Sequence, residues 1–166
     1  KLGGDFMYHK TLVAYFSATG TTAKAAKKLA EAAGADLYEI KPQIPYSHAD
    51  LNWMDPKSRT SLERKNPAIR PEIEEGMEDI AQYDEIFIGF PIWWYTAPNI
   101  IHTFLESFDW KGKRIIPFAT SGGSNLGNTC EDLQKSCPGA TVVQGKMLNG
   151  SFAEETLQKW IASLQK

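Results

Sequence analysis

The sequence predicts an α/β protein: a three-layer α/β/α sandwich built on a five-stranded parallel sheet. Short apolar runs alternate along the chain with segments of helical periodicity. Strands that alternate with helices form a parallel sheet with right-handed crossovers and helices on both faces. The clearest runs are apolar at successive positions rather than at every second one, as expected for strands that are buried on both sides.

Five short segments are predicted to be strands. They are residues 11–16 (TLVAYF), 35–40, 85–90 (EIFIGF), 114–119 and 141–144. The segment 35–40 carries the weakest signal. Pro117 weighs against a central place for the fourth strand, because proline has no N–H to donate to a neighbouring strand. The fifth strand either stops at Gln144 or resumes at Met147 after an interruption.

Helical periodicity is clearest directly after the first strand. Ala26, Leu29, Ala30 and Ala33 recur at the i, i+3, i+4, i+7 spacing of one helix face, and Gly34 is suited to end that helix. Four further segments carry helix signals. The predicted helices are residues 21–33, 67–80, 99–108, 126–136 and 154–164.

The chain between the second and third strands is unusually long. Residues 41–66 contain three prolines and no clear periodicity, and loops longer than about 12–15 residues are usually functional or mobile. Tyr46 and Trp53 either pack this loop onto the body of the protein or border a ligand. An apolar stripe then predicts the helix over 67–80. The stripe consists of Ile69, Ile73, Met77 and Ile80.

Size and composition fit one globular domain over residues 7–166 of the 166. Residues 1–6 are expected to be a tag remnant or a disordered N-terminus, with Met7 as the native start. The net charge of −2 argues against nucleic acid as a partner. No apolar run approaches the roughly 20 residues that cross a bilayer, so no membrane span is expected. No signal peptide is visible, and we expect a cytoplasmic protein.

The two cysteines, Cys130 and Cys137, are expected to be free thiols. Seven residues apart on one helix they would lie roughly 10 Å apart, which is too far for a disulfide. A bridge stays open only if the helix ends before Cys137, which the following Pro138 allows. No second cysteine pair or histidine lies nearby, so we expect no metal site.

The loop after the first strand is rich in hydroxyl groups. Ser17, Thr19, Gly20, Thr21 and Thr22 lead directly into the first helix. Backbone N–H groups at a helix start, together with hydroxyls, are suited to bind a phosphate. The loop lacks both the Gly-Lys-Ser/Thr of a Walker A motif and the G-x-G-x-x-G of dinucleotide-binding folds. Ordinary helix capping by Ser and Thr is the alternative interpretation.

The loop after the third strand is aromatic. Pro91, Trp93, Trp94 and Tyr95 stand in the run 91–98, which ends on a second proline. Such a cluster at the carboxyl end of a strand can form a wall for a flat ring. Alternatively, Trp93 or Trp94 fills a gap under the loop.

The loop after the fourth strand combines hydroxyls with glycines. Thr120, Ser121, Gly122 and Gly123 can bring backbone N–H groups close to the polar edge of a ligand. A plain turn with a helix cap is the alternative. The G-x-S-x-G pattern of a serine hydrolase is absent.

Taken together, the three loops resemble those of the flavodoxin family over residues 11–164. The resemblance implies the strand order 2-1-3-4-5 and a bound FMN (flavin mononucleotide) at the point where the strand order reverses. It implies that the loop after the first strand binds the FMN phosphate. It also implies that residues 91–95 lie along the isoalloxazine ring, and that residues 120–123 reach its pyrimidine edge.

The resemblance implies electron transfer through the flavin, either as a carrier or as an enzyme. A redox partner protein or a small-molecule acceptor would then be the partner. The P-x-W-W pattern also resembles NAD(P)H-dependent quinone reductases, in which Tyr95 and His102 would be the candidate general acids. Residues 91–98 contain no glycine, so a peptide flip is harder and two-electron chemistry is favoured. A binding module that has lost its cofactor is a third interpretation, and the oligomeric state is not predicted.

Overall fold

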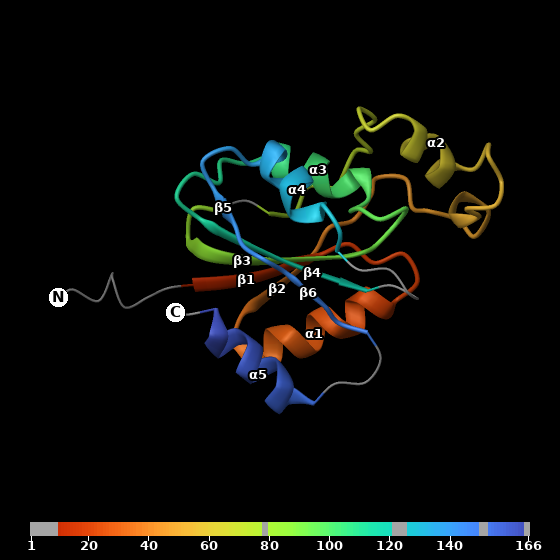
Figure 1. The fold of residues 1–166 in the computed structure, drawn as a ribbon. Helices are drawn as coiled ribbons and strands as arrows, with labels where there is room; N and C mark the ends of the chain where they lie inside the picture. The colour runs from red at the N-terminus through yellow and green to blue at the C-terminus, as the bar shows by residue number, and fades with distance from the viewer. Residues whose placement is uncertain (1–9, 78–79, 121–125, 150–152, 165–166) are drawn as a thin grey trace.

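The computed structural model describes residues 10–77, 80–120, 126–149 and 153–164. A twisted sheet of parallel strands forms the middle layer, and helices cover both of its faces (Figure 1). The strands are β1 (Lys10–Tyr15), β2 (Asp36–Glu39), β3 (Tyr83–Pro91), β4 (Arg114–Thr120), β5 (Thr141–Val142) and β6 (Lys146–Met147). The helices are α1 (Thr21–Ala33), the 3₁₀ turn η2 (Ala49–Leu51), α2 (Arg59–Lys65), α3 (Asn99–Glu106), α4 (Thr129–Ser136) and α5 (Glu154–Ser163).

The strand order is β2-β1-β3-β4-β5, which confirms the predicted order. All the pairs between these strands are parallel, and the short β6 pairs with β4 as an additional strand. The sheet edge beyond β4 is therefore shared by two short strands. The predicted interruption of the fifth strand lies between them.

Pro117 stands inside β4, and β4 is a central strand, so the objection raised by this proline was wrong. The carbonyl of Ile115 accepts from the N–H of Val143 at 3.0 Å, and that of Ala119 accepts from Leu148 at 2.7 Å. Backbone groups of alternate residues point to the same neighbouring strand. Pro117 therefore turns its ring nitrogen toward the fifth-strand edge, and the gap between β5 and β6 lies beside it. The missing N–H thus costs the sheet little.

Two clusters of buried side chains separate the layers. Leu29 of α1 and Leu157 of α5 pack on one face of the sheet, and Phe104 of α3 and Leu133 of α4 pack on the other; all four are 0% exposed. Each such side chain contributes about 1.5–3 kcal/mol when it is fully buried. In α1, Ala26, Leu29 and Ala30 of the predicted face are buried, Ala33 is half-buried, and Gly34 ends the helix with φ +62°. The two faces are thus closed by different helices.

The helix predicted over 67–80 was wrong. Its described residues contain no helix, and Ile73 instead forms an antiparallel bridge with Pro42. The N–H of Glu74 donates to the carbonyl of Lys41 at 2.7 Å. Pro71 accounts for the difference, because proline removes a helical hydrogen bond and pushes the preceding residue toward extended conformations.

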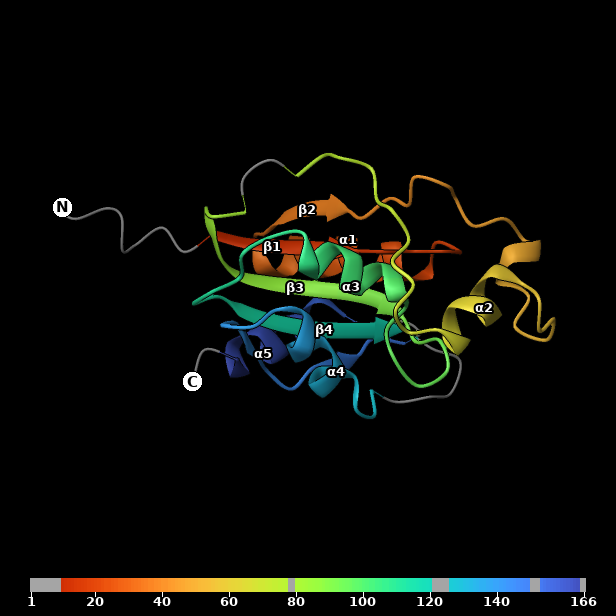
Figure 2. The same ribbon diagram turned by 90° about the horizontal axis from the view of Figure 1, so that it is seen from above.

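Helix α2 forms within the segment 41–66, for which no helix was predicted. Ser58 begins it, with its Oγ accepting from the N–H of Ser61 at 3.3 Å. The buried side chains of α2 are polar, namely Thr60, Ser61 and Glu63, so apolar periodicity could not reveal it. Seen from above, α2 lies beyond the carboxyl ends of the central strands (Figure 2).

Candidate functional site

The carboxyl ends of β1, β3 and β4, which the three predicted loops follow in the sequence, lie side by side. The N–H of Phe16 donates to the carbonyl of Gly89 at 3.0 Å, and the N–H of Ile92 donates to that of Thr120 at 2.9 Å. The strands therefore stay paired up to their last residues. Ligands of open α/β sheets bind at this edge, where the strand order reverses.

Ser17 shapes the loop after β1. Its Oγ accepts from the N–H of Gly20 at 3.0 Å and from the N–H of Ala23 at 3.2 Å. Gly20 is the N-cap of α1, with φ +97°, a conformation that side chains disfavour. Since a hydroxyl carries one proton as well as lone pairs, Ser17 can still donate to a ligand.

The start of α1 offers donors for an anion. The first N–H groups of a helix have no partner within it, and the helix dipole places partial positive charge there. No acidic residue occupies the first turn of α1, and since Ser17 takes the N–H of Ala23, the N–H groups of Thr21 and Thr22 are left for a ligand. Thr19 and Thr21 are exposed beside these N–H groups. This donor set, which has no fixed cation within the loop, fits the phosphate of a monoester such as FMN.

Thr22 and Thr120 join the loops after β1 and β4. Their hydroxyl oxygens lie 2.8 Å apart, and both side chains are buried. One of the two protons serves this hydrogen bond, so the pair keeps one more for a ligand. The contact brings the start of α1 to the end of β4; Ser121, Gly122 and Gly123 lie outside the described residues.

The aromatic loop after β3 is a tight turn. Trp93 and Thr96 exchange two backbone hydrogen bonds, of 3.0 and 3.3 Å. The two residues between them, Trp94 and Tyr95, both have positive φ, +50° and +71°. This geometry is that of a type I′ turn, which usually carries Asn or Gly. Two bulky residues in this conformation are strained and hold the turn in one shape.

The three aromatic side chains of this loop differ in their surroundings. The Trp93 ring meets Phe16 edge-on, with centroids 5.6 Å apart and planes at 86°. It also meets Tyr46, at 5.4 Å and 67°. Trp94 has the Arg64 guanidinium 5.5 Å from its ring centroid, whereas Tyr95 is 70% exposed. Trp93 therefore anchors the loop, and Trp94 and Tyr95 stand at its tip.

Tyr46 and Trp53, for which the sequence allowed either packing onto the body or contact with a ligand, differ in their surroundings. The Tyr46 ring packs onto the body against Phe16 and Trp93, at centroid distances of 5.6 and 5.4 Å. Trp53 is 68% exposed. Residues missed by the sequence interpretation are Arg59 and Glu63 of α2, which contact Tyr46. A buried carboxylate leaves no periodic signal in the sequence.

His102, the other candidate general acid, lies in α3. Its Nδ1 is 2.6 Å from the Oγ of Ser136, so it joins α3 to α4. Burial lowers the pKa of His102, and the charge of Arg70 acts in the same direction. This packing between two helices indicates a structural role.

Replacing His102 with glutamine is expected to make the free energy of unfolding fall less steeply as the pH is lowered into the mildly acidic range. The unfolded histidine takes up a proton near pH 6.5, but the folded one resists it, so unfolding becomes easier as the pH falls below 6.5 through the lower folded pKa. Urea unfolding of the wild type and the variant between about pH 7.5 and about pH 5.5 would measure how the free energy of unfolding of each protein changes with pH. Parallel curves for the two proteins would contradict the expectation.

The described residues show neither a metal cluster nor a membrane helix. Among them, no group of three or more His, Cys, Asp or Glu side chains could hold a metal ion. Within the same residues, no helix combines the length and apolarity that crossing a membrane requires. Cys130 and Cys137 are free thiols, as predicted, and burial raises the pKa of Cys137 to about 11.

Comparisons with known proteins agree with this fold. A crystal structure of a candidate flavoprotein from Bacteroides uniformis is 51% identical, with a TM-score of 0.88 and coverage of 93% of this chain and 98% of that one. A counterpart from Bacteroides eggerthii is 48% identical, with a TM-score of 0.89 and coverage of 95% and 98%. A flavoprotein from Lactobacillus acidophilus, solved in complex with FMN, is 24% identical, with a TM-score of 0.68 and coverage of 92% and 99%.

No curated protein matches the sequence. The flavodoxin family matches residues 10–164, which is nearly the whole chain. This chain belongs to the flavodoxin family.

Proposed function

We propose that this protein binds one FMN across the three loops and transfers electrons through it. The observation that carries the proposal is the contact of Thr22 at the start of α1 with Thr120 at the end of β4. Family membership and the FMN complex of the Lactobacillus acidophilus flavoprotein support the choice of cofactor. The flavin supplies the redox chemistry, and the chain supplies binding and orientation.

In this proposal the loop after β1 holds the phosphate. The N–H groups of Thr21 and Thr22 at the start of α1 and the hydroxyls of Ser17, Thr19 and Thr21 donate to it. Thr22 and Thr120 hold the loop and keep one proton for the ligand. Thr120, with Ser121, Gly122 and Gly123, stays the predicted partner of the pyrimidine edge.

The tip of the aromatic loop faces the isoalloxazine ring. Because Trp93 is already packed against Phe16 and Tyr46, the side chains left for the flavin are Trp94 and Tyr95. Pro91, at the end of β3, holds the loop at the sheet. A flat aromatic wall excludes water from one side of the ring.

The rigid turn favours the enzyme over the one-electron carrier. Trp94 and Tyr95 already have positive φ, and inverting the peptide between them would need a second strained conformation for bulky residues. A flavin that exchanges electrons in pairs suits an NAD(P)H-dependent reductase of quinones or flavins. In the same proposal the protein works in the cytoplasm and passes its electrons to a small-molecule acceptor.

The FMN-loaded protein should be mixed with NADH and a soluble quinone without oxygen. Oxidation of NADH at the rate of quinone reduction would support the reductase. Bound FMN that NADH leaves oxidised, but that accepts single electrons from a reduced protein partner, would support the carrier instead.

Replacing Gly20 with alanine is expected to weaken FMN binding about tenfold and to lower the free energy of unfolding by about 1–2 kcal/mol. No described atom lies within 4 Å of an added Cβ, so the cost is that of φ +97° rather than of a clash. Gly112→Ala is a matched control, since Gly112 also has positive φ and open space but lies just before the amino end of β4, whereas the three loops follow the carboxyl ends of their strands. Fluorescence titration with FMN and urea unfolding measure both effects. Equal losses of FMN affinity in the two variants would contradict the role of Gly20.

A further inference from the structure

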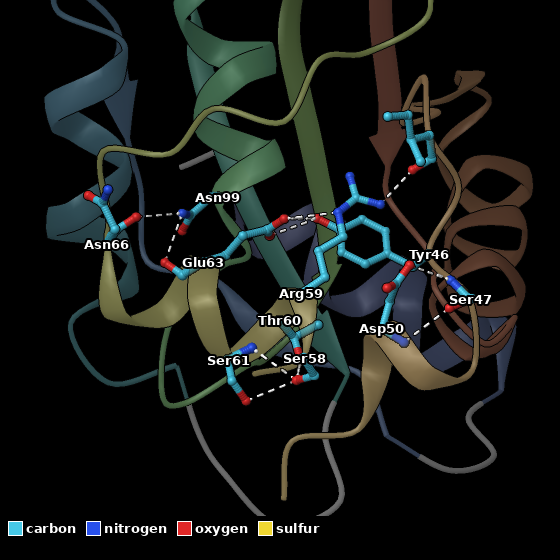
Figure 3. A network of polar contacts seen from close by, with 11 residues as sticks. Tyr46, Ser47, Asp50, Ser58, Arg59, Thr60, Ser61, Glu63, Asn66 and Asn99 are labelled. Atoms are coloured by element: carbon cyan, nitrogen blue, oxygen red, sulfur yellow. Dashed lines mark hydrogen bonds and ion pairs between the residues drawn. The ribbon is translucent and has the colours of Figure 1, made fainter. Parts of the chain in front are cut away.

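A buried polar cluster joins α2 to the segment that precedes it (Figure 3). The Glu63 side chain is only 7% exposed. The Tyr46 hydroxyl donates to its two carboxylate oxygens, at 2.7 and 2.9 Å, and the Arg59 Nε donates to one of them at 3.2 Å. Burying a carboxylate is strongly unfavourable unless it is paired and hydrogen-bonded. Both partners are therefore needed to keep Glu63 inside.

The cluster fixes the Tyr46 ring at its edge and on its face. The Arg59 guanidinium carbon lies 3.7 Å from the ring centroid, a close cation–π contact. Arg59 is itself held, because its Nη1 donates to the carbonyl of Ile44 at 2.6 Å. Since a carboxylate only accepts hydrogen bonds, the hydroxyl of Tyr46 must be the donor. Burial raises the pKa of Tyr46, so the proton stays in place.

The cluster is also fastened to the element that follows the aromatic loop. The side-chain amide of Asn99, the first residue of α3, donates to the carbonyls of Glu63 and Asn66, at 3.1 and 3.2 Å. A small cavity of about 80 Å³ lies between α2 and the aromatic loop, with Glu63, Trp93 and Trp94 among its walls. Trp93 thus shares this cavity with Glu63 of α2 and also contacts the Tyr46 ring.

We propose that Tyr46 is a positioning residue for the flavin site: clamped by Glu63 and Arg59, it fixes Trp93 and, through it, the turn that carries Trp94 and Tyr95. The inference rests on the proposed function for its effect on FMN, but the clamp itself acts in the flavin-free protein as well. The link from the clamp to the aromatic loop is the contact between the Tyr46 and Trp93 rings, so the proposed effect on the flavin runs through the orientation of Trp93.

The test compares Tyr46→Phe with Tyr83→Phe. The first change keeps the ring and removes the hydroxyl that Glu63 holds. The second removes a hydroxyl that donates to the carboxylate of Asp36 at 2.7 Å, a bond of the same kind at the opposite ends of the strands. We expect Tyr46→Phe to weaken FMN binding about tenfold and to change the visible circular dichroism of the bound flavin. We expect Tyr83→Phe to leave both within about twofold of the wild type.

Glu63→Gln supplies the conservative variant. Its amide oxygen still accepts from Tyr46, although the charge that Arg59 pairs with is lost. We expect FMN affinity and the visible signal to lie between those of the wild type and of Tyr46→Phe. Glu63→Leu leaves Tyr46 without an acceptor and should match Tyr46→Phe. If Glu63→Gln perturbs the flavin as much as Glu63→Leu does, the hydroxyl bond is not what positions the loop.

Near-ultraviolet circular dichroism of the flavin-free proteins separates this inference from the proposed function. The difference between wild type and Trp93→Phe gives the signal of Trp93. We expect Tyr46→Phe to lose most of that signal and Tyr83→Phe to keep it. An unchanged Trp93 signal in Tyr46→Phe would overturn the clamp, whether or not FMN binds. If the wild type binds no FMN, the proposed function is overturned. The near-ultraviolet comparison of Tyr46→Phe with the wild type would still decide whether Tyr46 positions Trp93.

Discussion

Replacing Gly89 with alanine is expected to lower the free energy of unfolding by about 3 kcal/mol. Gly89 lies in β3 opposite Phe118 of β4, and an added Cβ would stand 2.1 Å from the ring carbon Cζ. Phe118 is fully buried beneath α1 and α5, so its ring has no free space into which to move. Urea unfolding of the flavin-free protein measures the loss.

The matched control combines Gly89→Ala with Phe118→Leu. The smaller side chain removes the clash, so the double variant should lose less stability than the sum of the two single variants, by more than about 0.5 kcal/mol. Because the carbonyl of Gly89 holds Phe16 at the end of β1, Gly89→Ala should also weaken FMN binding. Additive losses would show that the ring contact is not the cause.

Replacing Trp94 with alanine is expected to weaken FMN binding roughly 30-fold, or about 2 kcal/mol, with little change in the stability of the flavin-free protein. Trp94 stands at the tip of the aromatic loop and is only partly buried. Alanine at φ +50° is strained much as tryptophan is, so the backbone cost stays the same. Titration of FMN fluorescence measures the affinity.

Trp53→Ala is the matched control for this change. Trp53 is 68% exposed and lies outside the three loops, on the long segment before α2. Its loss should leave FMN affinity unchanged. If Trp53→Ala and Trp94→Ala weaken binding equally, the tip of the aromatic loop does not face the flavin.

The strands and three of the five predicted helices could be placed well from the sequence, because their buried faces are apolar. The helix over 67–80 was wrong because its stripe, from Ile69 to Ile80, crosses Pro71. The predicted helix over 126–136 begins later, at Thr129. Helix α2 was missed for the opposite reason, since its buried side chains, Thr60, Ser61 and Glu63, are polar. Apolar periodicity reports a helix only where apolar side chains are the ones buried.

The three loops could be predicted because they follow strands whose order the resemblance implies. The contact between Thr22 and Thr120 spans 98 residues and follows from that order. The clamp of Tyr46 by Glu63 and Arg59 could not be predicted in the same way. It depends on how an irregular segment folds back, and no spacing in the sequence pairs Tyr46 with Trp93. Only the structure shows that Trp93 packs against the body of the protein while Trp94 and Tyr95 stand at the tip of the loop.

Titration of the flavin-free protein with FMN and, separately, with riboflavin tests the central claim most directly. Riboflavin carries the same ring without the phosphate. We expect one FMN per chain, and binding at least 100-fold tighter than that of riboflavin (about 2.7 kcal/mol from the phosphate donors at the start of α1). Equal affinities for the two flavins, or no binding of FMN, would contradict the assignment of this edge of the sheet as a flavin mononucleotide site.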